Sequence, residues 1–288
     1  MERWRTELGA ERIASLLAAN NEPGPSSFRV DLRQFSREHA IDLLAARGVR
    51  GVAHPLCETA LDIEGPVSAL AGMPGLAPQS VASQLVAALV APGAGERILD
   101  LCAAPGGKAA AIAERSTAGG RVFAADRARG GTRRIGERRR GREALLVLRA
   151  DGTRPPLTAG TFDAVLVDAP CSGLGTLRAH PEMRWRRGPG DVKRLAHLQA
   201  ELLDAAADLL RPGGRLIYAT CTLLREENED NVTAFRARHP GFDPIDPRPI
   251  LGAAAGLVGD DLALRTAPDV GSLDGFFAVV LRKDPGSV

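Results

Sequence analysis

Apolar and polar positions follow two patterns after residue 97: short apolar runs recur, and polar-rich stretches with helical spacing separate most of them. The runs predict strands at 97–102, 121–126, 144–150, 162–168, 215–220 and 276–282. Strands that alternate with helices are typical of a parallel sheet covered by helices. The sequence therefore predicts an α/β domain.

The clearest helix is predicted at 191–211. Leu195, Leu198 and Leu202 recur at helical spacing, Asp191 can cap the start, and Pro212-Gly-Gly follows the end. A second helix is expected from Pro78 to about residue 90, just before the first strand of the α/β domain.

The first seventy residues predict a separate small α+β unit. We expect a helix at 5–19, a strand at 28–32, a helix that begins after Ser36 as N-cap, and short strands near 50–54 and 60–64. The expected division is a lobe at 1–70 and a larger domain at 71–288.

Composition narrows the class of protein. The 288 residues are 44% hydrophobic and 25% charged, with no apolar run of the roughly 18 residues that a membrane span needs and no apolar leader after Met1. The four cysteines show neither Cys-x-x-Cys spacing nor a nearby histidine pair. A cytoplasmic protein without a metal site, disulfides or membrane attachment is expected.

The basic residues are almost all arginine. They concentrate at 127–142 and 184–187, although the formal net charge is only +2. The lysines are Lys108, Lys193 and Lys283. A lysine kept in so arginine-rich a chain is a candidate for a role that needs a compact ammonium group.

A glycine loop follows the first strand of the α/β domain, in the segment Cys102-Ala103-Ala104-Pro105-Gly106-Gly107-Lys108. Such a loop lets a ligand approach the backbone, although a tight turn without a ligand has the same local pattern. Asp126, Asp151 and Asp168 follow at the ends of the next three strands. An acid after the second strand can bind ribose hydroxyls, so the series favours a nucleoside-bearing ligand over simple helix capping. Because Gly-x-Gly-x-x-Gly is absent, NAD is disfavoured.

Two cysteines follow strands. Cys171 lies just after the strand at 162–168, in Asp168-Ala-Pro-Cys-Ser-Gly173, and Cys221 follows the strand at 215–220. A single cysteine at a strand end is most often a small buried hydrophobic residue. Cys57 and Cys102 are expected to be structural.

Several motifs together resemble one family. They are Asp100-Leu-Cys-Ala-Ala-Pro-Gly-Gly-Lys108, the Pro-Cys segment at 168–173, Ala219-Thr-Cys-Thr222 with Glu226-Glu-Asn-Glu229, Asp274-Gly-Phe-Phe277, and Gln79 with Ser83. In this order the chain resembles the NOL1/NOP2/Sun family of S-adenosylmethionine-dependent RNA cytosine-5 methyltransferases over about residues 1–283. It is most similar to the bacterial 16S ribosomal RNA methyltransferase B group without its NusB-like domain, which is expected to be either absent or missing from this chain.

The resemblance implies a doubly wound Rossmann-like methyltransferase fold with a small RNA-binding lobe, and S-adenosylmethionine held by the 102–108 loop, Asp126, Asp151 and Asp168. It assigns the nucleophile that attacks carbon 6 of cytosine to Cys221 and the removal of the carbon 5 proton to Cys171. Asp168 is expected to bind cytosine N3, and Lys108 to lie near Asp168.

RNA is the partner that the resemblance implies, with 16S ribosomal RNA first and transfer RNA as the alternative. Arg184, Trp185, Arg186 and Arg187 offer cations and a ring for RNA contact, or else form a solvated loop. A non-catalytic ribosome-assembly factor and a nicotinamide oxidoreductase are the rival functions. A binding protein would need neither cysteine, which favours the enzyme.

Overall fold

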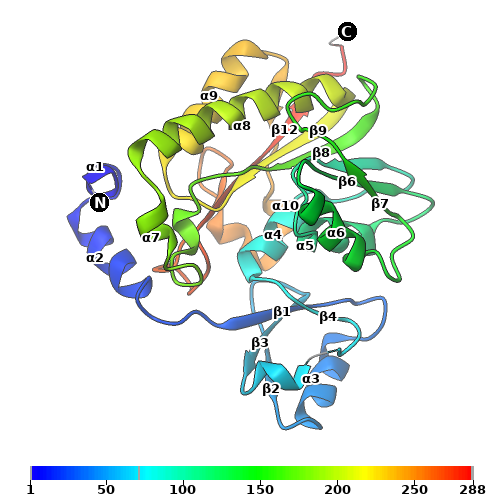
Figure 1. The fold of residues 1–288 in the computed structure, drawn as a ribbon, viewed down its shortest axis with the longest axis vertical. Helices are drawn as coiled ribbons and strands as arrows, with labels where there is room; N and C mark the ends of the chain where they lie inside the picture. Colours follow the sequence, from blue (N-terminus) through cyan, green and yellow to red (C-terminus); the bar gives the residue numbers. More distant parts are fainter. Residues whose placement is uncertain (1, 71, 287–288) are drawn as a thin grey trace.

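The computed structural model describes residues 2–70 and 72–286, and its larger sheet has the order β10-β12-β9-β8-β5-β6-β7, with β11 paired to β12 (Figure 1). The strands are β5 (Arg97–Asp100), β6 (Arg121–Asp126), β7 (Leu145–Arg149), β8 (Phe162–Asp168), β9 (Leu210–Thr220), β10 (Phe242–Pro244), β11 (Leu264–Thr266) and β12 (Phe276–Lys283). Strands β5 to β9 pair in parallel, which confirms the predicted α/β class.

The last predicted strand runs the other way. Strand β12 is antiparallel to β9, and β10 and β11 are both antiparallel to β12. The connection between β11 and β12 spans only residues 267–275. This is shorter than the dozen or more residues of a parallel crossover, so β11 and β12 have to be antiparallel. A sheet parallel throughout was a wrong expectation at this edge, because β12 is also antiparallel to β9.

Helices cover both faces of the sheet (Figure 1). Helices α8 (Pro189–Leu209) and α9 (Glu229–Arg238) lie on one face, and α4 (Val81–Ala88), α5 (Gly107–Arg115), α6 (Arg129–Arg138) and α10 (Arg248–Leu251) lie on the other. Successive strand residues alternate between the two cores: Ile98 packs with the α4 and α5 side, and Leu99 packs with the α8 side. Because β5 to β9 are parallel, their carboxyl ends lie at one edge of the sheet.

A second, four-stranded antiparallel sheet has the order β2-β3-β1-β4. Its elements are β1 (Ser26–Val30), α3 (Arg37–Ala45), β2 (Arg50–Ala53), β3 (Ala60–Glu64) and β4 (Leu76–Pro78). Ser36 caps α3 as expected, because its side chain accepts a hydrogen bond from His39 N at 3.2 Å. The sheet has its own core around Phe28, Leu44 and Leu61.

The expected helix at 5–19 is two helices, α1 (Glu2–Leu8) and α2 (Ala10–Ala19), because Gly9 between them has φ of 79°. Trp4, Ile13 and Leu16 pack against residues of the larger domain, including Val192 of α8. Figure 1 shows both helices beside α7 (Met183–Arg186), apart from the four-stranded sheet.

The long helix differs from its prediction at both ends. It begins at Pro189, and Asp191 at its third position accepts a hydrogen bond from Gly188 N at 3.1 Å. It ends at Leu209, and the Pro212-Gly-Gly segment lies inside β9, where pairing with β8 shifts register between Phe162 and Ala164. Among the described helices, none combines the length and the apolar character that crossing a membrane requires.

Candidate active site

A pocket of about 1360 Å³ opens at the carboxyl ends of β5, β6, β8 and β9. Ligands of open α/β sheets bind at this edge, since the loops there are free to vary while the sheet stays rigid. The predicted residues that line the pocket are Cys102, Ala103, Ala104, Pro105, Gly107, Lys108, Asp126, Asp151, Asp168, Cys171 and Cys221.

Gly106 is the one residue of the predicted loop that does not line the pocket, and it shapes the turn instead. It precedes α5 with φ of 98°, and a Cβ at this position would lie 3.1 Å from Ile135 Cα in α6. Glycine is needed here both for the left-handed backbone and for the close packing of α6. Lys108 lines the pocket from the second position of α5, the helix that follows the turn.

Asp126, at the end of β6, joins the glycine loop to the start of α6. Its Oδ2 accepts a hydrogen bond from Ala104 N at 3.2 Å, and its Oδ1 accepts one from Ala128 N at 2.7 Å. Each carboxylate oxygen has a second lone pair, so the group can still accept hydrogen bonds from a ligand. A Cβ on Gly131 would lie 2.5 Å from Asp126 Oδ1, so α6 also needs glycine at that position.

Asp151 lies two residues beyond β7 and is exposed. Its Oδ1 accepts hydrogen bonds from the Thr153 backbone at 3.0 Å and side chain at 2.8 Å, and these bonds lower its pKa. Asp151 therefore remains ionised at the rim of the pocket.

Lys108 and Asp168 form a largely buried ion pair, with 2.7 Å between Lys108 Nζ and Asp168 Oδ2. The Lys108 ammonium also lies 5.0 Å from the centre of the Phe276 ring. Burial opposes the charge on Lys108, but Asp168 outweighs it and raises the lysine pKa, with a further contribution from Cys221. The cation is thus fixed between a carboxylate and an aromatic face.

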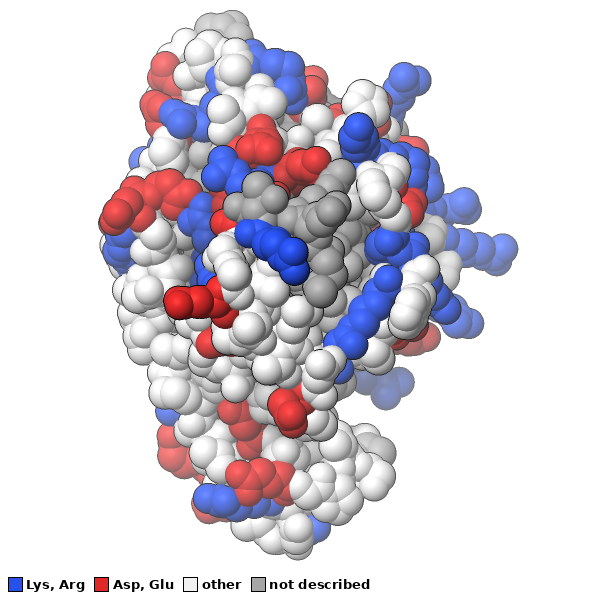
Figure 2. Space-filling model, turned by 90° about the vertical axis from the view of Figure 1, so that its left-hand side faces the viewer, with Lys and Arg blue, Asp and Glu red and all other residues white. Residues whose placement is uncertain are grey.

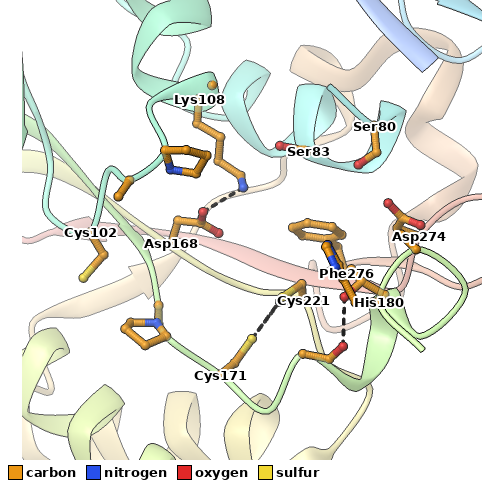
Figure 3. A pocket seen from close by; sticks show the side chains of 18 of the residues that line it. Ser80, Ser83, Cys102, Lys108, Asp168, Cys171, His180, Cys221, Asp274 and Phe276 are labelled. Carbon is orange, nitrogen blue, oxygen red and sulfur yellow. Dashed lines mark hydrogen bonds and ion pairs between the residues drawn. The ribbon is translucent and has the colours of Figure 1, made fainter. Parts of the chain in front are cut away.

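The two cysteines come together because β8 and β9 are neighbours. Cys171 Sγ and Cys221 Sγ are 3.2 Å apart, and Cys221 N lies 3.3 Å from Cys171 Sγ (Figure 3). The hydrogen bond to Cys221, reinforced by burial, raises the pKa of Cys171 well above its usual range. Figure 3 places this pair and the Lys108–Asp168 pair on one side of the pocket, with Ser80 and Asp274 across from them.

The other cysteines do not join the pair. Burial raises the pKa of Cys102, which lines the pocket beside the glycine loop. Cys57 is buried in the core and contacts Thr59 and Gln84.

Sequence reasoning did not assign a role to Asp100, the last residue of β5. It is 1% exposed, and neither carboxyl oxygen has a hydrogen-bond partner among the described residues. Burial, with Asp168 close by, raises its pKa to about 8. The one available signal was an acid at the end of an otherwise apolar run.

The rim of the pocket draws on segments far apart in the sequence. Residues 23–25 and Ser27 come from the small lobe side, and residues 272–274 come from the turn before β12. The short helix α7 also borders the pocket through Met183, and Trp185 on it is 89% exposed. Arg184, in contrast, donates a hydrogen bond to Asn20 O at 2.9 Å and so connects α7 to the residue that follows α2.

Basic side chains gather along one edge of the face drawn in Figure 2, whereas acidic ones are scattered over it. Among the arginines of 127–142, Arg127 just before α6 and Arg133 on α6 are about four-fifths exposed. Arg142 is an exception, because its guanidinium binds Glu114 at 2.5 Å and is largely buried.

Comparison with known proteins identifies the family to which the chain belongs. The family described as 16S rRNA methyltransferase RsmB/F matches residues 87–282, and the ferredoxin-like domain of RsmF/B-like methyltransferases matches residues 1–69. The chain belongs to the RsmB/F methyltransferase family. Two relatives named ribosomal RNA small subunit methyltransferase B are similar: that of Cronobacter sakazakii is 41% identical over 83% of this chain and 57% of its own length, and that of Vibrio cholerae is 37% identical over 95% and 62%. The chain therefore spans about three fifths of these relatives.

Solved structures agree with this family fold. The crystal structure of PH0851 matches with a TM-score of 0.88 and 30% identity over 98% of this chain and 65% of that one. NSun6 from Pyrococcus horikoshii, solved with SFG, matches with a TM-score of 0.82 and 21% identity over 98% and 97% of the two chains, and shows the fold. The resemblance and the Rossmann-like methyltransferase fold predicted from the sequence are confirmed.

The cofactor of this RsmB/F methyltransferase is S-adenosylmethionine. The pocket suits it: a glycine turn that lets a ligand approach the backbone, and a half-buried Asp126 carboxylate with lone pairs to spare, lie side by side. The volume of the pocket also exceeds the roughly 300–1,000 Å³ that is typical of a pocket for one small molecule, and this leaves room for a second ligand beside the cysteines.

Proposed function

We propose that the protein transfers a methyl group from S-adenosylmethionine to carbon 5 of a cytosine in RNA, through a covalent adduct between Cys221 and carbon 6. The observation that carries the proposal is the contact between Cys171 and Cys221 on adjacent strand ends, beside the Lys108–Asp168 pair. Names of the relatives favour 16S ribosomal RNA as the substrate, with transfer RNA as the alternative. A ribosomal RNA substrate in bacteria would place the protein in the cytoplasm.

The lining of the pocket supports a proposal for the cofactor-binding residues. The backbone of 102–107 would border the cofactor, and the Asp126 carboxylate would accept hydrogen bonds from its ribose hydroxyls. Asp151 at the rim would face the base of the nucleoside. When bound, the cofactor supplies an electrophilic methyl group.

Carbon 5 of cytosine is a weak nucleophile until a thiolate adds to carbon 6. In the proposed first step, the electron pair of the Cys221 thiolate forms the bond to carbon 6, and the ring electrons shift towards carbon 5 and N3. Asp168 would take up a proton from solvent as cytosine binds and share it with N3, which would stabilise that charge, and Lys108 keeps Asp168 in place at 2.7 Å. The electron pair on carbon 5 would then form the bond to the methyl group, while the bond between that methyl group and the cofactor sulfur would break and leave a neutral thioether.

The second step needs a base, because carbon 5 now carries both a methyl group and a hydrogen. Cys171 holds its own proton most strongly while Cys221 is anionic, since Cys221 is the first cause of its raised pKa. Once the Cys221 sulfur is bonded to carbon, that cause disappears and Cys171 loses its proton more easily. Cys171 would give its own proton to solvent, and its thiolate would then remove the proton from carbon 5. The electron pair of that C–H bond forms the double bond between carbons 5 and 6, and the bond from carbon 6 to sulfur breaks to release the Cys221 thiolate.

Two variants test the roles. Cys221→Ala should abolish methylation and form no adduct, whereas Cys171→Ala should attack RNA and stall as a protein–RNA complex that survives denaturation. Denaturing gel electrophoresis with labelled RNA and cofactor gives the answer. Adducts that accumulate in Cys221→Ala would reverse the roles, and methylation by both variants would refute the covalent mechanism.

A further inference from the structure

Glu227 is a carboxylate buried behind the two cysteines, in the turn Arg225–Glu227 that follows the Cys221 loop. Its exposed fraction is 0%. Oε1 accepts hydrogen bonds from Ser172 N at 2.8 Å and from Gln199 Nε2 at 3.0 Å, while Oε2 has no partner among the described residues. A buried carboxylate costs several kcal/mol unless it is well compensated, so this group needs a reason to be there.

The hydrogen bonds around Glu227 join the two cysteine loops. Ser172 and Thr222 each follow one of the cysteines, and their hydroxyl oxygens are 2.8 Å apart. Asn228, next to Glu227, donates from its side chain to Thr222 O at 3.0 Å. Glu227 therefore binds the Cys171 loop through Ser172 N, while its neighbour binds the Cys221 loop.

A third element supports the same turn. Tyr218 of β9 is fully buried, and its hydroxyl donates to Glu227 O at 2.5 Å. Gln199 of α8, which donates to Glu227 Oε1, also donates to Pro170 O at 2.9 Å on the cysteine loop. Strand, helix and turn thus hold one buried network, which meets the pocket at Pro170 and at the cysteine pair.

The charges around the pair are unequal. Lys108 lies on the Cys221 side, where the sulfur contributes to the raised pKa of the lysine, and Asp168 neutralises part of that cation. Glu227 lies on the Cys171 side, where its charge adds to the causes that raise the pKa of Cys171. Arg187 contacts the same loop only through Ser172 O, at 3.2 Å.

We infer that Glu227 is a positioning residue that holds the Cys171 loop against the Cys221 loop and keeps the proton of the pair on Cys171, so that Cys221 is the thiolate. The inference rests on the proposed function for its catalytic consequence. Its chemical consequence, the unequal reactivity of the two neighbouring thiols, can be measured on the free protein and does not depend on the proposed function.

Glu227→Gln tests the inference, because it removes the charge while keeping the shape. Asp230→Asn is the matched control: Asp230 lies three residues further on, is half exposed and pairs with Arg225 at the surface. The free protein is alkylated with iodoacetamide from pH 6 to pH 10, and peptides that contain Cys171 and Cys221 are quantified by mass spectrometry. Wild type and control should react first at Cys221, and Glu227→Gln should react at Cys171 at a lower pH and lose the preference.

Methylation gives the second reading. Glu227→Gln should lower kcat on the order of 10²-fold, the effect of a displacement near 1 Å at a reacting group, with the Kd for S-adenosylmethionine and the KM for RNA unchanged. An unaltered thiol preference together with wild-type kcat would overturn the inference. If wild type does not methylate RNA cytosine, the proposed function fails, and the alkylation pattern still decides the role of Glu227.

A milder pair of variants covers the case in which Glu227→Gln does not fold, as judged by circular dichroism. Thr222→Val removes the hydroxyl that faces Ser172, and Thr222→Ser keeps it. Loss of kcat and of thiol preference in Thr222→Val, with both retained in Thr222→Ser, supports the coupling of the loops. Equal behaviour of the two variants refutes it.

Discussion

Asp100→Asn should change how the free energy of unfolding depends on pH. The carboxyl group is 1% exposed with no hydrogen-bond partner among the described residues, and burial, with the nearby charge of Asp168, raises its pKa to about 8 from an ordinary 3.8. Between these two values the folded protein keeps a proton that the unfolded chain loses. The stability contributed by this group is therefore fully present below pH 3.8 and is lost as the pH rises to about 8.

The magnitude follows from the pH interval. Each pH unit in which only the folded state holds the proton lowers the free energy of unfolding by about 1.4 kcal/mol. From pH 5 to pH 8 the loss is therefore about 4 kcal/mol, a large share of the roughly 5–15 kcal/mol that stabilises a typical domain. Asparagine has nearly the same shape and does not titrate, so Asp100→Asn should lack this loss.

Urea denaturation of wild type and Asp100→Asn, followed by circular dichroism at pH 5, 6, 7, 8 and 9, measures the effect. The variant should become more stable relative to wild type by about 4 kcal/mol across this range. Asp243→Asn, at a carboxylate 82% exposed, is the control and should parallel wild type. Parallel curves for wild type and Asp100→Asn would show that Asp100 is ionised in the fold and would refute the reasoning.

Three further predictions concern the ligands. Asp126→Ala should weaken S-adenosylmethionine binding by roughly 1.5–3 kcal/mol in calorimetry, because it removes a charged acceptor; an unchanged Kd would move the ribose contact elsewhere. Arg186→Ala combined with Arg187→Ala should lower the slope of RNA affinity against salt concentration by up to about two phosphate contacts. Methylation should be stronger on protein-free 16S ribosomal RNA than on assembled subunits, because a cytosine packed in a subunit cannot be flipped out. A slope equal to wild type, or a preference for assembled subunits, would contradict the respective expectation.

The strands of the larger domain could be predicted because their pattern is local. In 162–168 and 215–220 the apolar runs are long enough to be read without knowledge of their neighbours, and both strands are where they were expected, although β9 starts earlier. The direction of β12 could not be predicted in this way. It depends on pairing with β9, which lies far away in the sequence, and β11, the strand just before β12, has only three residues and no distinct pattern.

Some residues of the candidate site could likewise be placed from the sequence, and others could not. Parallel neighbouring strands bring their ends to one edge, so the acids and cysteines that follow strands could be placed together in advance. Asp100 and Glu227 could not, because their importance lies in burial without a full set of partners, which only packing determines. Glu227 stood in a motif typical of the family, yet the sequence did not show that it reaches the backbone after Cys171.

The wall of the pocket contributed by the small lobe is a property of three-dimensional packing. Arg29 of β1 is 3% exposed, donates to Gln79 Oε1 at 2.7 Å, and forms an ion pair with Glu114 of α5. Burial, with Arg142 nearby, lowers the pKa of Arg29 to about 9, so the guanidinium is still charged at neutral pH and needs Glu114. Helix α5 also carries Lys108, and Gln79 donates to Ser83 at 3.1 Å beside the pocket. A buried arginine therefore links the lobe both to α5, the helix that carries Lys108, and to Gln79 at the edge of the pocket, so the lobe is held in place beside the candidate site.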